Sequence, residues 1–468
     1  MIRIVLADLR HSWRIWIGAL VLLAVIQALS TWIGAMALIG LTDIDWANVT
    51  SDLASKQPDP VALAPLGLAS ATITCGLILA IVMIGTVRGV ATLVVSQRRR
   101  LLALWQLSGM TDAQSGRILN LQFVALGLVA TVFGLVIGAA TIGGVIGYVA
   151  TGGLIVPGMS TAATPLGMLL GIVVGLVIIF AGAAGAGREI RSVRPTEAIQ
   201  GAGASDLRMT PLRWIVACGL LGLAALLYVF MAAGNDFANA GTALLIASLL
   251  FVFALSAAGP LTVMGFLRTW TALVPRGRSV SWFLARSALQ AASSRVVASV
   301  IPVAVSVVLI VGLYSINDST NAAVVAAGRA GAGGDPGLFS VIALVGLPII
   351  VSVVGAGVLV FMAGQQREKE IALGALAGAT PRQQILQAVF EAVIVVVTGV
   401  VTGMVGVLLG LAALQGPFHA ALGVGGFAIS WPAFGLIAGL VLVVNLLATI
   451  VPTAVAQGTA NLRLVAAT

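Results

Sequence analysis

The chain has 468 residues, of which 60% are hydrophobic and 8% charged, and its mean hydropathy is +1.13. A chain this apolar cannot cover a folded domain with polar surface, which excludes a water-soluble protein. The net charge of +9 does not indicate nucleic-acid binding, because the basic residues are scattered between apolar runs rather than gathered together. The pattern predicts an all-α polytopic membrane protein.

Ten apolar segments are long enough to cross a membrane as helices. They cover about residues 15–40, 66–95, 117–150, 166–187, 213–233, 240–267, 296–316, 338–364, 385–413 and 431–455. Three arginines precede the first segment, as in a secretory signal, but the segment is far longer than the apolar part of such a signal. We therefore expect it to be retained as the first transmembrane helix.

The distribution of charge predicts the orientation of the spans. If the N-terminus is cytoplasmic, Lys56 and Arg329 are the only basic residues in the loops on the far side. Those loops are acidic instead, with Asp43, Asp45, Asp52, Asp59, Asp236, Asp318 and Asp335. Because lysine and arginine concentrate in cytoplasmic loops, we expect both termini in the cytoplasm. The far-side loops are too short to form a separate extracellular domain.

A polar segment between the second and third predicted spans recurs between the eighth and ninth. QRRRLLALWQLSGMTDAQ, residues 97–114, matches QREKEIALGALAGATPRQ, residues 366–383, at eight of 18 positions without a gap. Glutamine, arginine, glycine and threonine are among the matches, so shared hydrophobicity does not account for them. The repeat predicts two related units in one chain.

Each copy has the residues of a helix, a corner and a second helix. In the first copy, Leu104 and Leu107 share one face of a helix that ends at Gly109, where glycine allows a left-handed conformation. Thr111 then begins a new helix, and Gln114 completes a capping box. The second copy has Leu373, Leu376, Gly378, Thr380 and Gln383 at these positions, with Pro381 in the first helical turn. A plain connection needs only a few turn residues, so we expect a partner to dock on these helices.

The second copy resembles the signature of FtsX-like ABC transporter permeases, of the MacB and lipoprotein-release type. The resemblance lies in REKEIALGALAGATPRQQI, residues 367–385, and in REIRSVRPTEAIQG, residues 188–201, which resembles the end of a permease unit. In that family the first segment is a cytoplasmic helix between the second and third spans of a four-helix unit, where it contacts a separate ATPase. Two such units with two spans between them follow the plan of BceB-type permeases.

The resemblance implies an organisation and a set of docking residues. Residues 1–200 would form an N-terminal FtsX-like unit (spans 1–4), 201–275 a two-span linker, and 276–468 a C-terminal unit (spans 7–10). The docking residues would be Arg98, Arg99, Arg100, Leu104, Leu107, Gly109 and Thr111 in the first copy, and Arg367, Glu368, Glu370, Leu373, Leu376, Gly378, Thr380 and Pro381 in the second. Leu101 stands where the second copy has Glu370, which predicts a different or weaker ATPase contact there.

The chain lacks the lysine-containing phosphate-binding loop through which an ATP-driven transporter hydrolyses ATP. Its two lysines, Lys56 and Lys369, neither follow a G-x-x-x-x-G pattern nor precede serine or threonine. We expect no catalytic residue and no bound cofactor, with ATP and Mg²⁺ held by a partner ABC ATPase, two copies per chain. The only histidines, His11 and His419, lack metal-ligand spacing, so no metal site is expected. Membrane lipids would surround the chain, and nucleic acid is not an expected partner.

Two polar residues fall within predicted spans at equivalent positions of the repeat, Gln122 and Glu391. We expect Glu391, near the cytoplasmic interface, to have a structural role with an arginine partner rather than to relay protons. Cys75 and Cys218 lie in apolar runs and are expected to be buried free thiols.

These features predict the permease subunit of an ATP-driven transporter in a bacterial inner membrane. Without an extracellular domain, export or extraction of an amphiphilic or hydrophobic substrate is favoured, such as a lipid, a peptide antibiotic, haem or a drug. Two alternatives stay open. One is a secondary transporter driven by an ion gradient, and the other is a signalling or regulatory membrane scaffold coupled to an ATPase.

Overall fold

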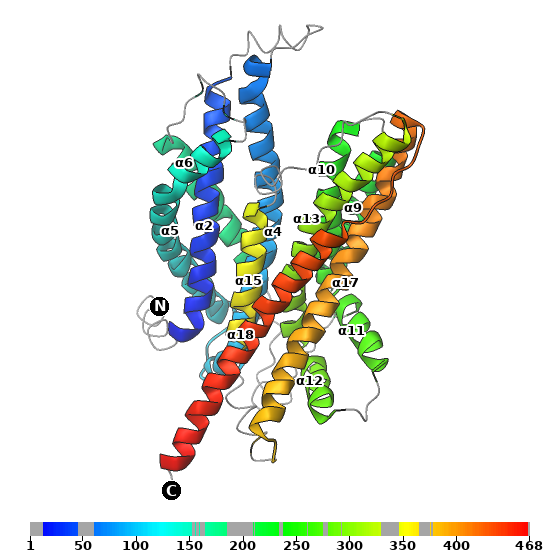
Figure 1. Ribbon diagram of the computed structural model, residues 1–468. Helices are drawn as coiled ribbons and strands as arrows, with labels where there is room; N and C mark the ends of the chain where they lie inside the picture. Colours follow the sequence, from blue (N-terminus) through cyan, green and yellow to red (C-terminus); the bar gives the residue numbers. More distant parts are fainter. Residues whose placement is uncertain are drawn as a thin grey trace. The chain divides into compact units, whose positions relative to one another are not determined.

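The computed structural model describes residues 13–44, 60–151, 164–184, 211–233, 237–259, 261–274, 279–291, 293–328, 346–364 and 378–466, with residues 155, 159, 209 and 375. All regular structure in these residues is helical (Figure 1). The helices are α2 (Trp13–Thr42), α4 (Pro60–Leu107), α5 (Asp112–Thr151), α6 (Pro165–Ala183), α9 (Pro211–Ala233), α10 (Phe237–Ala257), α11 (Thr262–Ala272), α12 (Val280–Ala291), α13 (Ser293–Ala326), α15 (Leu347–Gly364), α17 (Pro381–Leu422) and α18 (Trp431–Ala466). The all-α polytopic prediction is confirmed.

Nine helices in the described part of the chain are long and apolar enough to cross a membrane. Each coincides with one of the ten predicted spans. The eighth predicted span, 338–364, lies partly outside the described residues, and α15 occupies its second part. The sixth was predicted as one helix over 240–267, which is wrong, because α10 ends at Ala257 and α11 begins separately at Thr262. The break falls at Gly259, next to Pro260 in the sequence, and both residue types interrupt helices.

The helices form two compact units, each with its own packing. The first unit contains α2, the part of α4 up to Val87, α5 from Arg117, and α6. The second unit contains α9 to α13, α17, α18, most of α15, and residues 88–116, which include the end of α4. The predicted boundaries at residues 200 and 275 stay predictions.

In the first unit, α2 and α6 approach each other through small residues. A Cβ atom added to Gly171 of α6 would overlap the carbonyl oxygen of Ser30 and the Cα atom of Thr31 in α2. Gly34 of α2 is equally crowded by the backbone of Gly171. Since lipid gives no hydrophobic driving force between helices, such close backbone contact is a main source of their association.

A glutamine is buried where α5 and α6 pack on α2. Gln27 is fully buried, and its Nε2 donates to the carbonyl oxygen of Gly171 at 3.4 Å. Its Oε1 has no hydrogen-bond partner among the described residues. Added Cβ atoms on Gly134 of α5 and Gly175 of α6 would both meet this side chain. Gln27 therefore fills space that the two glycines leave open.

In the second unit, α17 is the central helix and contacts α9, α10, α12, α13 and α18 (Figure 1). Gly399 and Gly403 of α17 pack against α13, while Gly406 and Gly410 face α10. Where α17 meets α10, Ser248 Oγ of α10 donates to the carbonyl oxygen of Gly406 at 3.1 Å. The small residues of α17 thus bring two neighbouring helices close on two faces.

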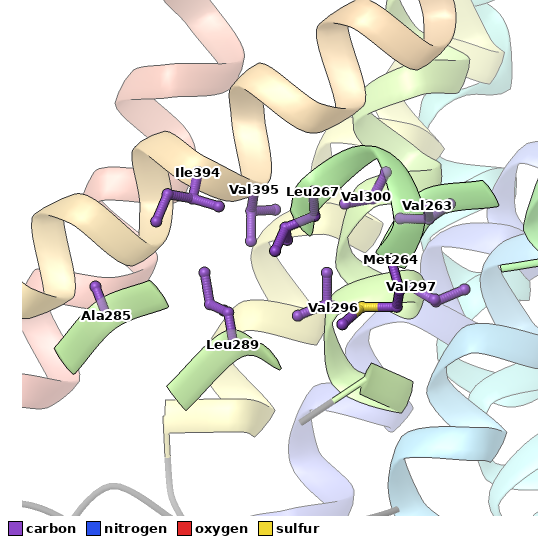
Figure 2. Close-up of a cluster of buried hydrophobic side chains, with 10 residues drawn as sticks. All are labelled: Val263, Met264, Leu267, Ala285, Leu289, Val296, Val297, Val300, Ile394 and Val395. Carbon is purple, nitrogen blue, oxygen red and sulfur yellow. The ribbon is translucent and has the colours of Figure 1, made fainter. Parts of the chain in front are cut away.

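Helices α11 and α12 are short and lie beside the first half of α17. Figure 2 shows the buried cluster that they share with α13 and α17. It contains Val263, Met264, Leu267, Ala285, Leu289, Val296, Val297, Val300, Ile394 and Val395. Beside it, Trp270 Nε1 of α11 donates to Thr398 Oγ1 of α17 at 3.1 Å. These contacts hold the first half of α17 against two helices of 11 and 12 residues, each shorter than a membrane crossing needs.

At the other end of α17, the loop to α18 is held by side chains. Gln415 Nε2 donates to the carbonyl oxygen of Gly426 at 2.7 Å, and Gln415 Oε1 accepts from the Gly426 N–H at 3.1 Å. Ser319 Oγ of α13 donates to the carbonyl oxygen of Ala428 and accepts from the Ala428 N–H, both at 3.0 Å. The loop is therefore an ordered part of the unit.

Candidate functional site: the two helix corners

The first corner joins α4 to α5. Gly109 has φ +95°, and the Met110 N–H donates to the carbonyl oxygen of Trp105 at 3.0 Å, as in a Schellman C-cap. The Thr111 N–H donates to Gln114 Oε1 at 3.0 Å, and the Gln114 N–H donates to Thr111 Oγ1 at 3.3 Å. The predicted glycine stop and capping box are both confirmed here.

The second corner precedes α17 and has the same geometry. Gly378 has φ +88°. The Thr380 N–H donates to Gln383 Oε1 at 2.9 Å, while the Gln383 N–H donates to Thr380 Oγ1 at 3.3 Å. Pro381 is the first residue of α17, as predicted. The two corners of the sequence repeat therefore share a glycine with positive φ followed by a threonine–glutamine capping box.

The helix that enters the first corner differs from the prediction. We expected a short separate helix, but α4 runs without a break from Pro60 to Leu107. The stretch from Val95 to Leu107 has no glycine or proline and consists mainly of good helix formers, so nothing stops the membrane helix before the corner. The corner is thus attached directly to a predicted transmembrane helix.

Exposed leucines lie on the last turns of α4. Leu104 is 51% exposed and Leu107 is 60% exposed, next to the corner. Arg98, also a predicted docking residue, is buried instead of lying on this surface. The side chains of Arg99 and Arg100 lie outside the described residues, as do Arg367, Glu368, Glu370, Leu373 and Leu376 of the second copy. Their predicted role stays a prediction.

Two neighbouring helices hold the second corner through contacts that were not predicted. Ser281 Oγ of α12 donates to the carbonyl oxygen of Gln383 at 3.1 Å. Gln457 Nε2 of α18 donates to the carbonyl oxygen of Pro381 and to Gln384 Oε1, both at 3.0 Å. These partners are 73 to 102 residues apart in the sequence, so no local pattern connects them. The sequence offers one signal for Gln457. The segments PTEAIQG at 195–201 and PTAVAQG at 452–458 both begin with Pro-Thr and end with Gln-Gly, so this glutamine recurs in the chain.

The two intramembrane polar residues are both buried, Gln122 to 1% exposure and Glu391 to 3%. Gln387 Nε2, one turn earlier on α17, donates to Glu391 Oε1 at 3.0 Å. The expected arginine partner of Glu391 stays a prediction.

The described residues contain no group of three or more histidine, cysteine, aspartate or glutamate side chains placed to hold a metal ion. Cys75 is buried, as expected, but the prediction for Cys218 is wrong because it is exposed. Cys218 lies on α9, whose apolar side chains are largely exposed within the unit.

Comparison with known families finds a match that includes the second corner. Residues 342–457 match the model of the FtsX-like permease C-terminal family. This part of the chain is an FtsX-like permease domain. No curated protein matches the chain.

The FtsX-like permease domain covers the second corner, α17, the described part of α15 and α18 as far as Gln457. The match supports a permease-type membrane subunit of ABC transporters, and the family in general works with an ABC ATPase. Family membership of this kind goes with transport rather than with catalysis by the subunit. The first corner lies outside the matched residues.

Proposed function

We propose that the chain is the permease subunit of an ATP-driven transporter, with separate ABC ATPases docking on residues 97–114 and 366–383. The observation that carries this proposal is the shared geometry of the two corners, one of which lies within the FtsX-like permease domain. A second, equivalent corner supports an internal repeat and two ATPase subunits per chain. The exposed Leu104 and Leu107 give the first docking helix an apolar contact surface.

The continuity of α4 supports a mechanical role for the first corner. An unbroken helix of 48 residues carries a displacement at its end into the membrane span, because intrahelical hydrogen bonds resist bending. Binding and hydrolysis of ATP by the partner would then shift the permease between two discrete packings of its helices.

The far-side end of α17 supports a substrate taken from the membrane. The α17–α18 connection is the short ordered loop 423–430, which holds no separate domain. We propose export or extraction of an amphiphilic or hydrophobic molecule, such as a lipid, peptide antibiotic, haem or drug. Both termini would be cytoplasmic, in a bacterial inner membrane.

Docking can be tested by placing charge on the leucine surfaces. We expect Leu104→Asp with Leu107→Asp to lower the recovery of the partner ABC ATPase with the tagged chain, because the carboxylates must be desolvated at the interface. Leu373→Asp with Leu376→Asp should have the larger effect, since the first copy lacks the equivalent of Glu370. Leu273→Asp, at an 84% exposed position after α11, is the matched control. Unchanged recovery in both double variants contradicts the proposal.

The driving force separates this function from its alternatives. In liposomes containing the chain and its ATPase, substrate movement should require ATP hydrolysis and persist when the proton gradient is collapsed. Movement that stops with the gradient and continues without ATP would identify a secondary transporter. ATP turnover without movement of any lipid or drug probe would favour the regulatory scaffold.

A further inference from the structure

The second corner is tied to two other helices of its own unit. The first turn of α17 contacts α12 through the hydroxyl group of Ser281 and α18 through the amide group of Gln457. Gln383, whose carbonyl oxygen accepts from Ser281, also closes the capping box with Thr380. Gln383 therefore takes part both in the capping box and in the contact with α12.

The contacts continue into the apolar interior of the unit. Ala285 and Leu289 follow Ser281 on the buried face of α12 and lie in one cluster with Ile394 and Val395 of α17 (Figure 2). Helix α12 is thus held to α17 over about two turns, since Ser281 and Leu289 are eight residues apart. The buried face of α12 thus lies against the first half of α17 along this contact.

Gly378 gives the corner a point about which it can pivot. It has φ +88°, and no described atom lies within 4 Å of the position that its Cβ would take. A glycine in open space gives little resistance to backbone rotation. Ser281 and Gln457 bond residues that follow Gly378, so their contacts hold the first turn of α17 and leave this pivot free.

We propose that Ser281 and Gln457 are positioning residues that lock the first turn of α17 to α12 and α18. With the lock in place, force that reaches the first turn of α17 turns the starts of α17 and α12 and the end of α18 as one body. This inference rests on the proposed function of the corner. It concerns coupling to the ATPase and not ATPase docking, because neither residue lies on the docking helix.

The first measurement of the lock needs no ATPase. In the full-length chain, Gln457→Leu should make the backbone amides of residues 382–386 exchange hydrogen faster than in the wild type, because the start of α17 loses its contact with α18. Gln415→Leu removes a comparable amide clamp at the other end of the same helix and should leave these amides unchanged. Equal exchange in Gln457→Leu and the wild type overturns the lock.

The second measurement uses the ABC ATPase that co-purifies with the chain. In Gln457→Leu the stimulation of ATP hydrolysis should fall about fivefold, the low end of coupling between distant sites, while recovery of the ATPase is retained. Ser281→Ala should weaken stimulation less, because it removes one hydrogen bond rather than two. Adding Gln384→Leu to Gln457→Leu should cause little further loss, since these side chains share one contact.

The outcomes separate the lock from the proposed function. If the wild-type chain recovers no ABC ATPase, the proposed function is overturned, and hydrogen exchange still decides whether the lock exists. If the wild type is stimulated and Gln457→Leu is stimulated equally, the positioning role is overturned and the proposed function stands. Should Gln457→Leu not reach the membrane, Ser281→Ala decides by the same two measurements.

Discussion

Individual glycines decide which helix pairs come into close contact. Gly171 of α6 lies against the backbone of α2, whereas no described atom lies within 4 Å of a Cβ built on Gly147 of α5. Both belong to glycine pairs spaced four apart, Gly167/Gly171 and Gly143/Gly147. The same sequence pattern therefore has different consequences, depending on whether another helix faces it.

We expect Gly171→Ala to lower the thermal stability of the purified protein. The added methyl group overlaps backbone atoms that cannot move without separating α2 from α6, and overpacking of this kind costs about 1–3 kcal/mol. Gly147→Ala is the matched control and should be neutral or slightly stabilising, because alanine favours the helix. Equal melting temperatures for the two variants would show that the α2–α6 contact does not limit stability.

Replacing the buried polar residue Gln27, in contrast to Gly171, is expected not to destabilise the protein. Its Nε2 makes one long hydrogen bond, and its Oε1 has no partner among the described residues. Gln27→Met keeps a similar unbranched shape and removes the unpaired oxygen, so we expect stability to be retained or to rise by about 1 kcal/mol. The measurement is the melting temperature in detergent. A clear loss of stability would indicate that Oε1 has a partner, such as a bound water molecule.

At the scale of elements, a glycine in a left-handed backbone conformation lies near each end of α17. Gly378 precedes its first turn with φ +88°, and Gly423 follows its last turn with φ +74°. An alanine costs about 1 kcal/mol at either position, because Cβ meets the neighbouring peptide group in this conformation. Replacing either glycine with alanine should therefore introduce similar backbone strain, at opposite ends of one helix.

We expect Gly378→Ala to impair ATP-driven transport more than Gly423→Ala, although both should lower the melting temperature by similar amounts. Only Gly378 lies at a proposed docking corner, so only there does a change of direction displace the ATPase contact. Transport and ATP hydrolysis are measured in liposomes with the partner ATPase. Equal losses in the two variants would show that strain alone, and not the corner, determines the effect.

At the scale of the whole molecule, the length of α17 makes the orientation testable. Its 42 residues correspond to about 63 Å of helix, twice the thickness of the hydrocarbon core, so both ends lie outside it. Arg382 and Ala421 are exposed near the two ends of this helix. A cysteine at either position is therefore open to a water-soluble reagent.

In intact cells we expect a membrane-impermeant maleimide to label Ala421→Cys but not Arg382→Cys, because the basic loops predict a cytoplasmic start of α17. Cys75→Ala and Cys218→Ala remove the background. Arg382→Cys should react after permeabilisation, which controls for its accessibility. The reverse pattern would invert the topology and place the docking helices outside the cell.

The sequence by itself determined the membrane helices and the two corners, because both depend on local chemistry. An apolar stretch of 20 residues has few alternatives to a helix in lipid, where every backbone N–H and C=O needs a partner within the segment. A capping box needs only residues three positions apart, as Thr111 with Gln114, and glycine is the residue that takes positive φ without strain. These features were therefore predictable at residue level.

Only the tertiary structure decided which side chains meet across the helices. Arg98 is buried although arginines usually lie at the surface, and Cys218 is exposed although cysteines usually do not. Ser281 and Gln457 reach the second corner from helices far away in the sequence. In a chain that is apolar on all sides, hydrophobicity does not distinguish a lipid-facing position from a packed one, so contact between helices decides.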